Sequence, residues 1–107
     1  MDNLPVLISL LERGADPNLS DRLGWTPLIY ANTRDFASAL LRHGANVNKA
    51  DKAGWTPLMY AVEEGNKSMV DFLLANDADI SLRTNDGKTA EDIAVLNDHP
   101  FILAQEN

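Results

Sequence analysis

Apolar residues along the chain recur with the spacing of amphipathic helices, and one arrangement of them occurs twice. The repeated positions are Leu28, Ala31, Leu40 and Leu41 in one segment, and Leu58, Ala61, Leu73 and Leu74 in the next. A single pair of short helices cannot bury its apolar face alone. The pattern therefore predicts helix pairs whose apolar faces pack against neighbouring pairs.

Polar residues before these helices carry the signals of a turn that leads into a helix. In the stretch DRLGWTPLIYA, the Asp21 carboxylate can accept hydrogen bonds from backbone N–H groups two residues on, and Gly24 can adopt positive φ. Thr26 is a preferred N-cap residue, and Pro27 suits the first helical position. The stretch DKAGWTPLMYA repeats these signals 30 residues later.

The repeated unit resembles the ankyrin repeat. Three segments align on Gly24, Gly54 and Gly87, which are 30 and 33 residues apart, and the stretches LLERGADPN, LLRHGANVN and LLANDADIS fall in phase with them. The resemblance covers essentially the whole chain. It implies an all-α solenoid of stacked helix-turn-helix units with β-turn tips, about three to four units including partial end caps.

The phase of the repeat predicts one domain over residues 1–107. Its parts are an N-terminal half repeat (1–20), a shortened repeat (21–50), a full repeat (51–83) and a C-terminal capping repeat (84–107). The half repeat contains only a second helix, which Asn3 can cap. The capping repeat predicts a first helix from Thr89 to about Val95 and a short second helix opened by Pro100. Six helices or helix stubs are expected, with no sheet.

The shortened repeat lacks three residues between its two helices. Removing three residues from a continuous helix turns the remainder of the helix by about 60° and shortens it by about 4.5 Å, which would take Leu40 and Leu41 off the shared seam. The loss is therefore expected in the loop. We predict that the first helix ends near Ala31, and that Asn32 or Thr33 caps a second helix with Asp35 in its first turn.

Two interpretations of this deletion stay open. It is either tolerated variation in a solvent-facing loop, or it opens a notch beside Glu63 and Glu64 that admits a side chain of a partner.

In the ankyrin-repeat family the turn tips and the ends of the first helices line a concave face that binds partners. The resemblance places Trp25 and Trp55 there, roughly 10 Å apart, either as a contact platform or as rings that cover the neighbouring turn. The matching variable positions at the tips are Arg22, Leu23, Lys52, Ala53, Asn85, Asp86 and Lys88, and those at the first-helix ends are Glu63, Glu64 and Asn97. Tyr30 and Tyr60 are expected in the core or at its edge, each with a hydrogen-bond partner for its hydroxyl.

The net charge of −7 argues against binding to nucleic acid by phosphate neutralisation. Residues 1–50 contain five acidic and five basic residues, whereas residues 51–107 contain eleven and four, so the second part carries the whole net charge. Such a surface either keeps the protein in solution or attracts a basic partner.

No arrangement of residues points to catalysis or to a cofactor. The chain has no cysteine, and His43 and His99 lie in different units without an acidic residue at metal-ligand spacing. No serine has an adjacent histidine in the expected layout. No apolar run approaches the length of a membrane helix, and a cytoplasmic protein without enzymatic activity is expected.

Two functions remain in view. The first is a protein–protein interaction module, and the alternative is an inhibitor or immunity-type protein that masks a basic enzyme or toxin. The N-terminal half repeat also has no covering first helix for its apolar residues Val6, Leu7, Ile8, Leu10 and Leu11. Two of these five are expected to remain exposed, unless the chain is part of a longer protein, or a partner or second copy covers them in a homodimer.

Overall fold

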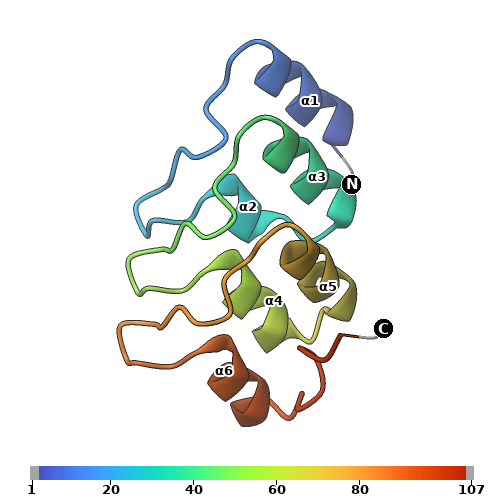
Figure 1. Ribbon diagram of the computed structural model, residues 1–107. Coiled ribbons are helices and arrows are strands. Elements are labelled where there is room, and N and C mark those ends of the chain that lie inside the picture. Colours follow the sequence, from blue (N-terminus) through green and yellow to red (C-terminus); the bar gives the residue numbers. More distant parts are fainter. Residues whose placement is uncertain (1–2, 106–107) are drawn as a thin grey trace.

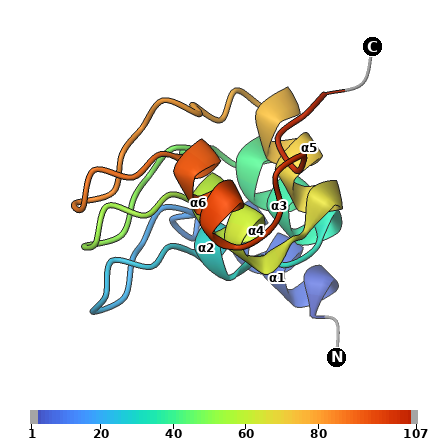
Figure 2. The same cartoon turned by 90° about the horizontal axis from the view of Figure 1, so that it is seen from below.

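The computed structural model describes residues 3–105, which form two layers of helices and contain no β-strand. The helices are α1 (Leu4–Glu12), α2 (Pro27–Tyr30), α3 (Arg34–Arg42), α4 (Pro57–Glu64), α5 (Lys67–Ala75) and α6 (Ala90–Leu96). Helices α1, α3 and α5 form one layer, and α2, α4 and α6 form the other (Figure 1). The long loops project beyond the second layer (Figure 2). The all-helical stack of paired helices confirms the predicted fold class.

Threonine side chains begin the helices of the second layer, as the turn signals predict. The side chains of Thr26, Thr56 and Thr89 each accept a hydrogen bond from the backbone N–H three residues on. Asn3 stands at the corresponding position before α1, but its side chain makes no capping bond, so the expected cap is absent. Its backbone carbonyl still accepts the first helical bond, from Leu7 N at 3.0 Å.

The loss of three residues is taken up in the loop between α2 and α3. Helix α2 has four residues and α4 has eight, so α2 ends about one turn early, with Ala31 as its C-cap. Thr33 Oγ1 accepts a hydrogen bond from the backbone N–H of Phe36 at 3.4 Å and caps α3. Leu40 remains 1% exposed, like Leu73 at the equivalent position of α5. The predicted loop position of the deletion and the preserved register of α3 are both confirmed.

The apolar core follows the seam between successive units. Leu28, Leu58 and Ile93 from the second layer are almost fully buried, together with Leu40 and Leu73 from the first. Burial of one such side chain stabilises the fold by about 1.5–3 kcal/mol.

The seam ends at α1, where the predicted exposure of two apolar side chains to solvent is confirmed. Leu11 is 6% exposed, whereas Val6 and Leu10 are 58% and 51% exposed. Leu7 and Ile8 are partly buried against the core, so two of the five apolar residues of the half repeat face solvent.

The segment after α6 corrects one expectation, because residues 100–103 form turns instead of a second helix. A single helical turn would leave nearly all its backbone groups unpaired. Here Lys67 Nζ of α5 donates to the carbonyl oxygens of Ile102 at 3.0 Å and Ala104 at 2.5 Å. Ile102 is 7% exposed, so these contacts fix the segment over the end of the core.

Successive turn tips are joined by single backbone hydrogen bonds. Lys52 N donates to Leu23 O at 3.0 Å, and Asn85 N donates to Ala53 O at 3.0 Å. Both bonds need a close approach of two backbones, and Gly24 and Gly54, with φ of +82° and +83°, stand at the points of approach. The tips of the three units are therefore held side by side.

Two asparagine side chains make a second set of connections between units. Asn18 Oδ1 accepts from Asn46 N at 2.6 Å, and Asn48 Oδ1 accepts from Asp79 N at 2.8 Å. Each of these loops is therefore tied directly to the next unit.

Candidate functional site

Four aromatic rings form a continuous row at the base of the turn tips. Their order is Tyr30, Trp25, Tyr60 and Trp55, with ring-centroid distances of 5.0, 4.9 and 4.9 Å. Each distance lies in the range of favourable tilted aromatic pairs. Tyr60 of one unit thus lies between the tryptophans of two units. We call these four residues the aromatic row.

The role of the two tryptophans as a contact platform stays a prediction, and the structure shows how their rings pack. Trp25 and Trp55 are half-buried, so each ring packs against its neighbours and also presents some surface. Tyr60 is partly buried at the core edge, as expected, but Tyr30 is 60% exposed, which corrects its expected place in the core or at its edge. Tyr30 lies outside because its hydroxyl donates to the exposed Asp21 and no preceding first helix covers its ring within the described chain.

In each of the first two units, one carboxylate fixes both a turn and an aromatic pair. Asp21 Oδ1 accepts from the backbone N–H groups of Leu23 at 3.0 Å and Trp25 at 2.9 Å, while Asp21 Oδ2 accepts from the Tyr30 hydroxyl at 2.5 Å.

Asp51 repeats this arrangement in the next unit. Its Oδ1 accepts from Ala53 N and Trp55 N, both at 2.9 Å, and its Oδ2 accepts from the Tyr60 hydroxyl. The turn bonds follow from the sequence, and a partner for each tyrosine hydroxyl was expected, but the choice of Asp21 and Asp51 as these partners was not predicted. The equal nine-residue separation of aspartate and tyrosine in both units is the signal that would have revealed them.

The third unit replaces all three members of this arrangement together. Thr84, Lys88 and Ile93 stand 33 residues after Asp51, Trp55 and Tyr60. Thr84 Oγ1 accepts from Lys88 N at 3.1 Å and keeps the turn, while Ile93 is buried in the core. The aromatic row therefore ends at Trp55.

The shared hydrogen bonds shift the acidities of the groups that make them. The hydrogen bond from Tyr30 lowers the pKa of Asp21, and the bond to Asp21 raises the pKa of Tyr30. Burial raises the pKa of Tyr60 further, and the hydrogen bond to Asp51 adds to this shift. The negative charge of Glu63 acts in the same direction.

Acid is expected to weaken the fold partly through Asp21. Its pKa is lowered in the folded chain, so the stabilisation is present above about pH 4 and is lost as pH falls through the folded value. We expect Asp21→Asn to show a shallower loss of unfolding free energy on acidification than the wild type, measured by urea unfolding at a series of pH values. Asp86→Asn controls for the loss of one charge, because Asp86 forms no hydrogen bond in the described chain. Equal slopes for Asp21→Asn and the wild type would contradict this role.

The structure brings most of the candidate binding residues close to the row. Seven of them are exposed on the three adjacent tips: Arg22, Leu23, Lys52, Ala53, Asn85, Asp86 and Lys88. Glu63 and Glu64 are exposed at the end of α4. Asn97 is exposed too, but its Nδ2 donates to Ile93 O at 2.8 Å and ends α6. Participation of all these residues in binding stays a prediction.

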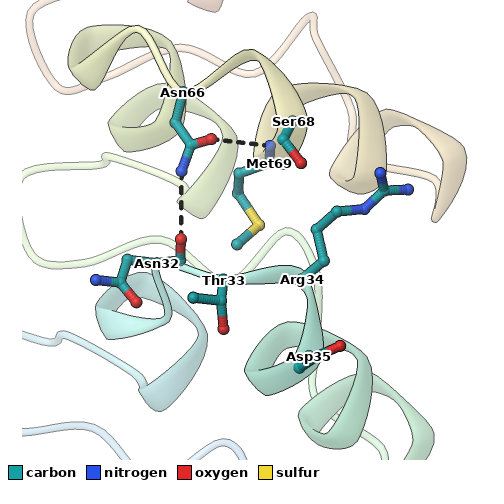
Figure 3. Close-up of a pocket in the computed structure, with 7 residues that line it drawn as sticks. All are labelled: Asn32, Thr33, Arg34, Asp35, Asn66, Ser68 and Met69. Atoms are coloured by element: carbon teal, nitrogen blue, oxygen red, sulfur yellow. Dashed lines mark hydrogen bonds between the residues drawn. The ribbon is translucent and has the colours of Figure 1, made fainter. Parts of the chain in front are cut away.

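A hollow of about 290 Å³ opens at the shortened loop (Figure 3). Its lining comes from the loop and the starts of α3 and α5: Asn32, Thr33, Arg34, Asp35, Asn66, Ser68 and Met69. The expected position beside Glu63 and Glu64 is thus wrong, since neither residue lines it. The short loop brings Asn32 O within 3.4 Å of Asn66 Nδ2, so the hollow faces the start of α5 instead of the end of α4.

The described residues offer no set of three or more histidine, aspartate or glutamate side chains arranged to hold a metal ion. Among the same residues, no helix combines the length and apolar character needed to cross a bilayer.

Comparison with known families gives one match. The family pattern described as ankyrin repeats, in three copies, matches residues 1–84. The match includes the aromatic row and the first two turn tips, and it ends where the third tip begins. A search of curated proteins finds no significant match.

Proposed function

The chain belongs to the ankyrin-repeat family, and we propose that it is a protein-interaction module that binds its partner through the aromatic row and the turn tips. Ankyrin repeats generally mediate protein–protein interactions. The aromatic row is the observation that carries the proposal for this chain. It supplies large side chains on the face that the family resemblance predicts to be concave.

The row is suited to binding because its geometry is fixed before a partner arrives. Trp25 and Trp55 are held by the turns that Asp21 and Asp51 organise, and Tyr60 lies between them. Tryptophan and tyrosine are enriched among the residues that contribute most to protein interfaces. Side chains that are already ordered lose little further conformational freedom on association.

The charge around the row favours a basic partner. Glu63 and Glu64 are exposed three and four residues after Tyr60 on α4, and their side chains form no hydrogen bond or ion pair within the described chain. Residues 51–107 carry the whole net charge of −7. Such a surface steers basic proteins toward it and speeds their association.

The same free carboxylates support the second candidate, an inhibitor that masks a basic enzyme or toxin. Both candidates use one surface, and they differ in what happens after binding. Loss of the partner's enzymatic activity on complex formation, with an association rate that falls as salt is added, would favour the inhibitor.

The test compares matched variants against a partner identified by affinity capture and mass spectrometry. Leu23→Ser at a tip is matched by Ile80→Ser in the loop after α5, since the two side chains are 62% and 54% exposed and Ile80 lines no hollow with a candidate binding residue. Glu63→Lys is matched by Glu12→Lys at the end of α1, which makes the same change of charge at another exposed position.

We expect Leu23→Ser and Glu63→Lys to weaken binding of the purified partner about tenfold each, and the two control variants to change it less than about twofold. Calorimetric titration gives the affinities, and circular dichroism checks that each variant is folded. Wild-type affinity in both Leu23→Ser and Glu63→Lys would refute the proposed face.

A further inference from the structure

Within the described chain, the N-terminal edge of the stack is formed by α1 and α2, which make no contact with each other. Helix α1 belongs to the first layer and packs on α3, but no helix of the described chain lies beside α2 on that edge (Figure 1). Helix α4, by contrast, lies between α2 and α6. One side of α2, and the side of α1 next to it, are therefore open.

The open edge consists of a ridge beside a trough. Val6 and Leu10 lie one turn apart on α1 and form the ridge, with exposures of 58% and 51%. The trough has a volume of about 320 Å³. It is lined by Leu7 of α1, by Pro27, Tyr30, Ala31 and Asn32 around α2, and by Phe36 and Leu40 of α3. A ridge and a trough of the same apolar character on one edge are what two copies related by a twofold axis require.

The distribution of charge also favours a second copy at this edge. Residues 1–50 contain equal numbers of acidic and basic residues, five of each, whereas residues 51–107 carry the net charge of −7. Two copies repel each other through the acidic part and not through the neutral part. A twofold contact at the N-terminal edge places the two acidic parts at opposite ends of the assembly, where their repulsion is smallest.

We propose that a second copy of this chain binds at the N-terminal edge, with the ridge of each copy in the trough of the other. The contact buries four otherwise exposed apolar side chains, Val6 and Leu10 from each copy. It covers Tyr30, whereas Trp25, Tyr60 and Trp55 do not line the trough. The proposal does not depend on the proposed function.

The first test is sedimentation of the full chain from about 1 µM to about 1 mM, where a weak dimer dissociates on dilution. We expect the mass to double across this range, and added salt to strengthen the dimer because it screens the repulsion between copies. Val6→Glu with Leu10→Glu should weaken the dimer at least about tenfold. Val95→Glu with Phe101→Glu is the control, because those side chains are 65% and 80% exposed at the other end.

The second test uses the absence of cysteine from the chain. A Leu10→Cys copy mixed with a Tyr30→Cys copy should form a disulfide-linked pair faster than a Leu10→Cys copy mixed with a Val95→Cys copy. Equal rates would contradict the ridge-in-trough geometry. A monomeric mass at every concentration, or a dimer that only the Val95→Glu, Phe101→Glu variant disrupts, would overturn the proposal and leave the edge to a helix of another protein.

Discussion

Substitution of Gly54 by alanine is expected to lower the free energy of unfolding by about 3 kcal/mol. A Cβ at this position would lie 2.8 Å from Asn85 N and 3.1 Å from the carbonyl carbon of Thr84. Those atoms are backbone, so the third turn tip must move away, and the hydrogen bond from Asn85 N to Ala53 O is strained or lost. The positive φ of +83° adds the cost of a left-handed conformation.

Gly87→Ala separates the two contributions. Gly87 has nearly the same φ, +84°, but a Cβ there would meet nothing within 4 Å. This variant should lose only about 1 kcal/mol, the cost of the left-handed backbone. Chemical denaturation of both variants measures the difference, which reports the close approach of two tips. Equal losses would show that the approach contributes nothing to stability.

The sequence predicts the features that depend on neighbours in the chain. The end of α2 near Ala31 and the cap at Thr33 follow from local residue types and from the need to keep Leu40 on the seam. The two exposed residues of α1 follow in the same way, because a half repeat offers one helix and no cover. The local helix propensity and the repeat period are sufficient to predict these features.

Other features depend on how units meet in space, and they were missed. Tyr60 reaches Trp25 only because two units stack at this particular distance, so its place in the aromatic row cannot be read from one unit. The expected helix at Pro100 failed for another reason. The carbonyl groups of Ile102 and Ala104 accept hydrogen bonds from Lys67, which lies 35 and 37 residues away, and this contact cannot be read from the local sequence.

Tyr60→Ala is expected to cost about 3 kcal/mol, because it removes two aromatic contacts and one hydrogen bond to a carboxylate. Tyr60 lies 4.9 Å from both Trp25 and Trp55, and its hydroxyl donates to Asp51, which is only 9% exposed. The substitution leaves the carboxylate without this donor in a poorly solvated site. It also opens a gap between two units of the stack.

Tyr30→Ala makes the same chemical change at the end of the row and should lower the free energy of unfolding much less. Tyr30 contacts one ring, Trp25, and its carboxylate partner Asp21 is exposed, so water can replace the lost donor. Tyr60→Phe keeps both ring contacts and should lose about 1–2 kcal/mol for the hydroxyl alone. Urea unfolding of the three variants should therefore give the largest loss of unfolding free energy for Tyr60→Ala. The loss for Tyr60→Phe should be smaller, and the loss for Tyr30→Ala should be no larger than that for Tyr60→Phe. Equal losses of unfolding free energy for Tyr30→Ala and Tyr60→Ala would contradict this role. They would show that each aromatic pair stabilises only its own unit and that the row does not join the two units to each other.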